Sequence, residues 1–103
     1  MTSTKFIEYR QMIESEYAKA CTKHPVFCDG IAPFGLDFED DERRFKKWNN
    51  ESEKHFACDI LQEEVYEALN AYQQGDRAHA LQELAQCGAV ILRMMDFIES
   101  EEK

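Results

Sequence analysis

Apolar residues recur at intervals of three and four along the first fifth of the chain. They are Phe6, Tyr9, Ile13, Tyr17 and Ala20. This spacing places them on one face of an amphipathic helix, which we predict from about residue 4 to residue 22. The helix is expected to end before Pro25, because the residue that precedes a proline is disfavoured in helical geometry.

Residues 25–37 break this regularity. They hold both prolines and two of the four glycines, with apolar side chains between them, so we expect a loop that packs over another part of the chain. The next stretch, residues 38–48, carries acidic and then basic side chains, and we expect one or two helical turns there. The alternation that is typical of a β-strand does not occur in the chain.

Two longer apolar patterns fill the second half of the chain. The first predicts a helix over about residues 50–74, because Asn50 with an acidic residue three positions later resembles a capping box. Gly75 is a natural helix stop and Asp76 a natural N-cap, so the next helix is expected over about residues 77–99. Two helices joined by so short a turn form an antiparallel hairpin.

These patterns predict an all-α antiparallel helical bundle that forms a single domain from residue 1 to residue 103. A domain of this length has a small core and exposes an apolar edge, so we expect a second copy to complete the bundle as a homodimer or larger homo-oligomer. No apolar run approaches the roughly 20 residues that cross a bilayer, and no signal peptide is evident. We therefore expect a cytoplasmic protein with reduced thiols and no membrane partner.

The charge balance narrows the choice of partners. Twelve Lys and Arg residues stand against 21 Asp and Glu residues, which gives a net charge of −9. A negative field of this size is opposite to that of proteins that coat nucleic acid or dock on anionic lipid, so we expect neither partner.

Acidic side chains interrupt the apolar faces of the predicted hairpin. On a helical wheel, Glu64 falls inside the apolar arc of the first hairpin helix and Glu67 at its edge, whereas Glu63 lies further toward solvent. Glu83 falls among apolar residues of the second helix, with Gln86 on the flank beside it. Unpaired carboxylates in a low-dielectric core are costly, so a positive charge must offset them.

A bound divalent metal ion is the economical source of that charge. Glutamate oxygens suit hard cations such as Mg²⁺, with Mn²⁺ as the alternative. Glu64 and Glu67 share a helix face at i and i+3, and so do Glu83 and Gln86. The other interpretation is a solvated acidic face, which is common in a chain with 21 acidic residues. Periodicity alone leaves both interpretations open.

The string Glu63-Glu64-x-x-Glu67, followed after a helix end and turn by Glu83-x-x-Gln86, resembles the EExxE…ExxD signature of the MazG-like all-α nucleoside triphosphate pyrophosphohydrolases. The likeness extends over the whole predicted hairpin, about 40 of the 103 residues. It implies a bundle of the MazG-like type, as a dimer or a tetramer. It also implies hydrolysis of a nucleoside triphosphate between its α and β phosphates, giving a monophosphate and pyrophosphate.

The resemblance further implies roles for the motif residues. Glu64, Glu67 and Glu83 would be Mg²⁺ ligands, and Glu63 a further ligand or the base that activates water, so that Glu63 and Glu64 would carry the catalysis. Gln86 stands where the signature has Asp. Its amide oxygen can still bind a hard cation, but it is neutral and cannot act as a base.

Two alternatives to an enzyme follow. Gln86 leaves open a catalytically weakened nucleotide-binding relative or a helical interaction module. The acidic face also leaves open a structural bundle that pairs with a basic partner.

Three further residues are candidates for substrate binding. Arg93 follows Gln86 by seven residues and Lys54 precedes Glu64 by ten, so either could meet a phosphate from the same helix face. Trp48, the single tryptophan, could stack on a base. An ion pair is the alternative for Arg93, and a core or rim position for Trp48.

Overall fold

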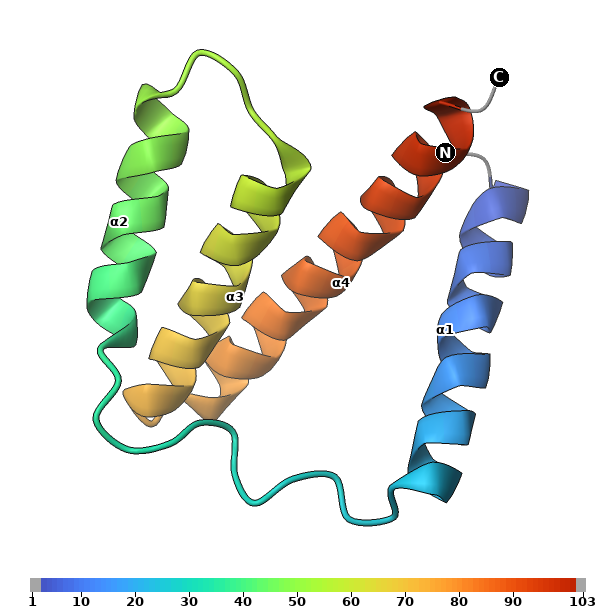
Figure 1. Ribbon diagram of the computed structural model, residues 1–103, viewed down its shortest axis with the longest axis horizontal. Helices are drawn as coiled ribbons and strands as arrows, with labels where there is room; N and C mark the ends of the chain where they lie inside the picture. Colours follow the sequence, from blue (N-terminus) through green and yellow to red (C-terminus); the bar gives the residue numbers. More distant parts are fainter. Residues whose placement is uncertain (1–2, 102–103) are drawn as a thin grey trace. The chain divides into compact units, whose positions relative to one another are not determined.

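The computed structural model describes residues 3–101, which form four α-helices and contain no β-strand (Figure 1). The helices are α1 (Ser3–Lys23), α2 (Phe38–Glu51), α3 (Ala57–Gln73) and α4 (Arg77–Glu101). The predicted all-α class is confirmed, while the single domain, the MazG-like bundle and the dimer stay predictions. The chain divides into two compact units, residues 32–91 and residues 1–31 with 92–103. Within the described range, no helix combines the length and the apolar character that crossing a membrane requires.

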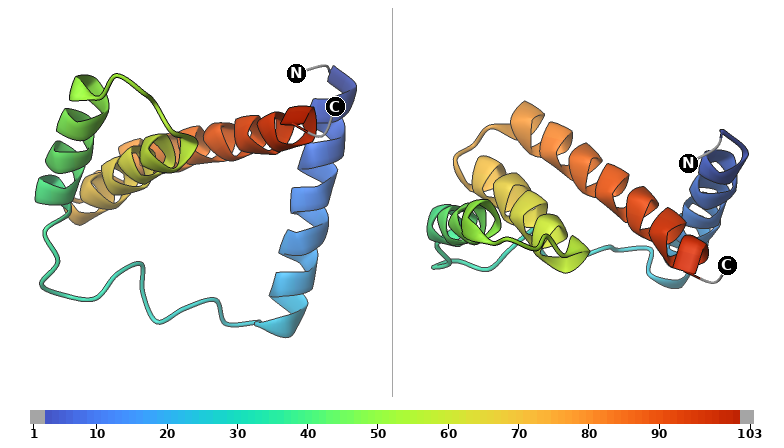
Figure 2. Two further views of the ribbon diagram at one scale, coloured as in Figure 1. Left: turned by 45° about the horizontal axis from the view of Figure 1, so that its top comes forward. Right: turned by 90° about the horizontal axis from the view of Figure 1, so that it is seen from above.

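The unit of residues 32–91 holds α2, α3 and the first part of α4. Short connections make each helix run antiparallel to the one before it (Figures 1 and 2). α2 packs against α3 through aromatic rings. The centroid of the Tyr66 ring lies 5.3 Å from that of Phe45 and 6.3 Å from that of Phe38. These contacts hold α2 beside the part of α3 that carries the acidic motif.

α2 spans 14 residues, so the expectation of one or two turns is wrong. Asp37 caps its N-terminus by accepting a hydrogen bond from the backbone N–H of Asp40 at 3.0 Å. Side chains about one turn apart then pair along the helix: Arg43 with Asp40, Arg44 with Asp40 and Asp41, and Lys46 with Glu42. The acidic residues followed by basic residues therefore support a full helix.

α3 begins at Ala57, so the helix start predicted at Asn50 is wrong. α2 continues through Asn50 to its C-cap at Ser52, whose N–H donates to the Trp48 carbonyl at 3.0 Å. The N-cap of α3 is Phe56, whose side chain makes no capping hydrogen bond. The start of α3 therefore has no side-chain cap, which is why no capping signal marks it in the sequence.

The turn between α3 and α4 forms as predicted. Gly75 has a φ of +84°, in the left-handed region that favours glycine, and its N–H donates to the Tyr72 carbonyl at 3.0 Å. Asp76 caps α4, because its Oδ1 accepts a hydrogen bond from the backbone N–H of His79 at 3.1 Å. The antiparallel hairpin of α3 and α4 is confirmed.

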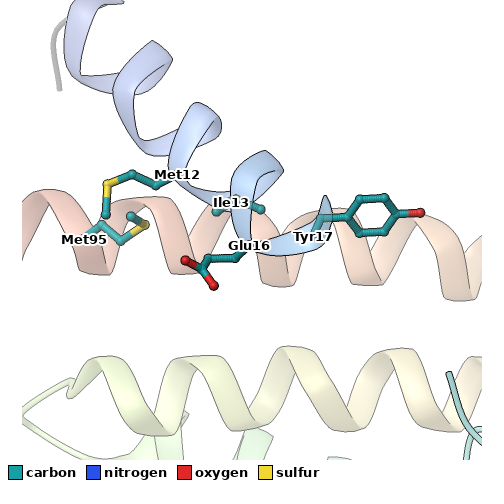
Figure 3. Close-up of a pocket in the computed structure, with 5 residues that line it drawn as sticks. All are labelled: Met12, Ile13, Glu16, Tyr17 and Met95. Atoms are coloured by element: carbon teal, nitrogen blue, oxygen red, sulfur yellow. The ribbon is translucent and has the colours of Figure 1, made fainter. Parts of the chain in front are cut away.

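The other unit joins α1 to the last part of α4. Lys5 Nζ lies 2.9 Å from Glu99 Oε2, and Tyr9 is buried, with 2% of its surface exposed. Burial, together with the Glu99 carboxylate, raises the pKa of Tyr9 to about 12. An apolar groove lies on this unit and is lined by Met12, Ile13, Glu16, Tyr17 and Met95 (Figure 3).

The apolar loop before α2 does not pack as expected. Val26, Phe27 and Phe34 are largely or fully exposed, so the prediction of a packed loop is wrong for these side chains. An irregular backbone does not gather its side chains onto one face, as a helix would. The end of the loop is tied to α3 by Gln73, whose Nε2 donates to the Leu36 carbonyl at 2.7 Å.

Candidate metal centre

Three glutamates on one side of α3 form the centre of the site. Glu63, Glu64 and Glu67 are half-buried, and one potential ligand atom from each lies within 4.8 Å of the others. Spacings of three and four residues return side chains to the same side of a helix, which explains the convergence. Glu63, which the helical wheel placed toward solvent, therefore belongs to the cluster.

Glu83 meets this cluster from α4. It is buried, with 7% of its surface exposed, and both of its carboxylate oxygens are engaged. Oε1 lies 3.0 Å from His79 Nε2, and Oε2 accepts a hydrogen bond from the Gln86 amide nitrogen at 3.2 Å. The same nitrogen donates to Glu64 Oε2 at 2.9 Å. The Gln86 amide thus bridges carboxylates of the two facing helices.

The clustered carboxylates disfavour one another's ionisation. Burial raises the pKa of Glu64, and the negative charges of Glu83 and Glu63 raise it further. Burial also raises the pKa of Glu67, which reaches about 8 with the contributions of Glu83 and Glu64. The cluster holds more negative charge than its surroundings balance, so a bound cation would stabilise it.

Two residues of α2 complete the surroundings. Asn49 donates from Nδ2 to Glu63 Oε1 at 3.0 Å and to the Asp59 carbonyl at 3.1 Å, so its amide holds the Glu63 side chain. Lys46 Nζ lies 3.8 Å from Glu67 Oε1. Three helices therefore build the site. The carboxylates lie on α3 and α4, and α2 provides two of the side chains that pair with them.

The donor set fits a hard divalent cation. Carboxylate oxygens are the ligands that Mg²⁺ and Mn²⁺ prefer in proteins, and those of α3 already lie within reach of a common ion. Gln86 could add its amide oxygen by rotating its side-chain amide. Chemically, the cluster can hold an ion together with a water molecule or a phosphate oxygen bound to that ion.

The three predicted substrate-binding residues lie in different places. Trp48 is on the last turns of α2, more than half exposed, and its Nε1 donates to Asp59 Oδ2 at 3.2 Å. Lys54 is exposed in the connection before α3, so the helical spacing that related it to Glu64 does not apply. Arg93 is exposed on α4, in the other compact unit. Their roles in substrate binding stay predictions.

Sequence reasoning missed Asn49, Lys46 and His79 as contacts of the cluster. Asn49 and Lys46 lie on α2, and nothing local in the sequence shows that this helix packs beside the acidic motif. His79 is half exposed, so no apolar pattern points to it. Its spacing of four residues from Glu83 on one helix is the signal that could have found it.

Cys87 lies one turn after Glu83 on α4. It is buried, whereas the other three free cysteines are exposed. Burial, with the negative charge of Glu64 and Glu83, raises the pKa of the Cys87 thiol. The thiol therefore stays protonated at neutral pH and acts as a small apolar group.

The chain matches no model of a known protein family, no curated protein and no solved structure. The resemblance to the MazG-like enzymes therefore rests on the motif residues and their spacing alone. A function for this site has to be argued from the chemistry of the residues that converge in it.

Proposed function

We propose that the chain is a Mg²⁺-dependent nucleoside triphosphate pyrophosphohydrolase of the MazG-like type. One observation carries this proposal: Glu63, Glu64 and Glu67 of α3 converge with the buried Glu83 of α4 where positive charge is scarce. These are the positions at which the motif resemblance places the metal ligands. Mn²⁺ is the alternative ion, because it accepts the same oxygen ligands.

The roles follow from the position of each side chain. Glu64, Glu67 and Glu83 would hold the ion, with Gln86 as a neutral ligand after its amide has rotated. When bound, the ion would offset charge on the phosphates and lower the pKa of a bound water. Glu63, whose Oε1 accepts a hydrogen bond from Asn49, would accept a proton from the attacking water. Glu63 is thus the base of the proposal.

The proposed reaction has one bond forming and one bond breaking. The water oxygen attacks the α-phosphorus of the triphosphate, and the water proton passes to Glu63. The bond from the α-phosphorus to the oxygen that bridges to the β-phosphorus breaks. Pyrophosphate leaves, and the nucleoside monophosphate is the second product. The substrate class is therefore a ribo- or deoxyribonucleoside triphosphate.

A panel of canonical and modified nucleoside triphosphates with Mg²⁺, read by pyrophosphate release, tests the proposal. We expect release that requires Mg²⁺ and that is abolished by Glu64→Gln or Glu83→Gln, because each removes a charged ligand. Glu39→Gln, which neutralises an exposed carboxylate in the first turn of α2, should leave release unchanged. The enzyme proposal is wrong if the protein binds Mg²⁺ and releases no pyrophosphate from any member of the panel.

Gln86 favours a second candidate, a chain that binds nucleotide without efficient hydrolysis or serves as a helical interaction module. It replaces the motif Asp with a neutral amide that hydrogen-bonds two carboxylates. Under this candidate, Gln86→Asp should create pyrophosphate release that the native chain lacks. Under the enzyme proposal, the native chain is already active.

We also propose that the chain forms a homo-oligomer. The unit of α1 and the last part of α4 exposes many large apolar side chains, which a second copy could bury. Those exposed by 40% or more include Phe6, Ile13, Tyr17, Phe97 and Ile98.

A further inference from the structure

Among residues 3–101, Lys46 brings an ammonium group to the carboxylate cluster. Its Nζ lies 3.8 Å from Glu67 Oε1 and 3.5 Å from Glu42 Oε2. The Lys46 side chain is 48% exposed, whereas that of Glu67 is 16% exposed. Lys46 therefore stands at the rim of the cluster, in contact with both water and a candidate metal ligand.

Its two carboxylate partners would respond differently to a divalent ion. Glu67 belongs to the ligand cluster, so an ion bound to its carboxylate would repel the nearby ammonium. Glu42 lies one turn before Lys46 on α2 and is not part of the cluster, so its ion pair with Lys46 would persist. At 3.8 Å, the contact with Glu67 is a weak, half-exposed ion pair that costs little to break. A bound ion would thus release Lys46 from Glu67 while leaving it beside the site.

A polyphosphate on such an ion still carries negative charge that needs a partner. The chain as a whole supplies little positive charge, because its net charge is −9. Lysine is a common partner of phosphate oxygens. We propose that Lys46 is the phosphate-binding residue of this site. It pairs with Glu67 in the metal-free protein and with a phosphate oxygen of a metal-bound polyphosphate. The inference rests on the proposed function for its substrate class.

Two effects of opposite sign follow from this exchange of partners. Removing the ammonium should strengthen the binding of Mg²⁺ alone, because Lys46 competes with the ion for Glu67. The same change should weaken the binding of a polyphosphate in the presence of Mg²⁺. A lysine that only fastens α2 to α3 would weaken both or change neither.

Calorimetric titration of the full chain with Mg²⁺, and then with inorganic tripolyphosphate in excess Mg²⁺, tests the inference. For Lys46→Met we expect Mg²⁺ to bind about two- to fivefold more tightly. We expect tripolyphosphate to bind at least about tenfold more weakly. Lys46→Arg keeps the charge and should bind tripolyphosphate within about threefold of the native chain. Lys47→Met, at the adjacent exposed lysine, should change neither affinity.

The inference is overturned if Lys46→Met binds tripolyphosphate as tightly as the native chain, or if Lys47→Met loses as much affinity. It is also overturned if the native chain binds no tripolyphosphate. If Lys46→Met loses helical content, the same titrations are made with Lys46→Gln, and its affinities decide whether the inference holds. The probe contains no nucleoside and the readout is not turnover. Failure of the enzyme proposal, seen as absent pyrophosphate release, therefore remains a separate result.

Discussion

Among single residues, Glu67 links the site to the stability of the protein. In the unfolded chain this carboxyl ionises near its ordinary pKa of 4.5, whereas in the folded, metal-free protein its pKa is about 8. Between these values the folded state holds a proton that the unfolded state lacks, so the free energy of unfolding falls as pH rises. The stabilisation that protonated Glu67 contributes to the free energy of unfolding is complete below about pH 4.5. It is lost as pH rises through about 8.

Thermal unfolding with a chelator between about pH 5 and pH 9 measures this slope. Glu67→Gln is the matched control and should flatten it, because the amide does not titrate. Under the proposed function, added Mg²⁺ would bind the ionised form of the carboxylates, so the gain in Tm on adding Mg²⁺ should grow with pH over the same range. A gain that is larger near pH 5 than near pH 8 would contradict the metal assignment.

Asn49 positions Glu63 through a hydrogen bond and should control the proposed role of Glu63 as a metal ligand or base. Asn49→Leu keeps the volume but removes the donor to Glu63 Oε1 and to the Asp59 carbonyl. We expect Mg²⁺ affinity to fall by about tenfold, as is typical when a partner of a metal ligand is lost, and stability to fall by about 1 kcal/mol. Calorimetry well below the Tm separates the two effects. Asn50→Leu, at the exposed neighbour, should leave Mg²⁺ affinity unchanged.

The sequence predicted the carboxylates of the site but not most of the side chains that pair with them. Glu64 and Glu67 lie on one helix, so their convergence follows from helical periodicity, which is a local property. Asn49 and Lys46 reach the cluster only because α2 packs along α3 through aromatic contacts. Such packing depends on residues distant in sequence, and no spacing rule within one helix reveals it.

At the level of helices, the Gly-Asp turn sets the start of α4 and, through it, the place of Glu83. Asp76→Ala removes the hydrogen bond to the His79 backbone N–H, and we expect a loss of about 1 kcal/mol in the free energy of unfolding. Urea denaturation measures this loss. Asp29→Ala, in the exposed loop before α2, should change stability much less. Equal losses in the two variants would show that Asp76 does not act as a cap.

The helices differ in how far the sequence predicts them. α1 and the α3–α4 hairpin follow from apolar periodicity and from the Gly75 stop, which are strong local signals. α2 has few apolar side chains, and its length comes from ion pairs between turns, so the apolar pattern underestimates it. The start of α3 lacks a side-chain cap. The Asn50 pattern therefore predicted the start within α2, before the connection that leads to Ala57.

For the whole molecule, the exposed apolar surface of the α1 unit predicts self-association. We expect the native chain to sediment as a dimer or tetramer. Ile13→Glu should shift it toward the monomer, because it places a charge in the apolar groove (Figure 3). Gln11→Glu adds the same charge at an exposed polar position of α1 and should leave the oligomer intact. A native chain that is monomeric at all concentrations contradicts the prediction.

The pairing of every carboxylate in the site has a consequence for how the protein is made. Glu63, Glu64, Glu67 and Glu83 each meet a donor from the chain, supplied by Asn49, Gln86, Lys46 and His79. We therefore expect a newly synthesised chain to fold before any ion arrives, unlike small domains whose folding depends on a metal. Metal loading would then be an exchange, in which the proposed ion displaces protons and protein donors. Under the proposed function, the supply of metal rather than the synthesis of the chain would set when the site is filled.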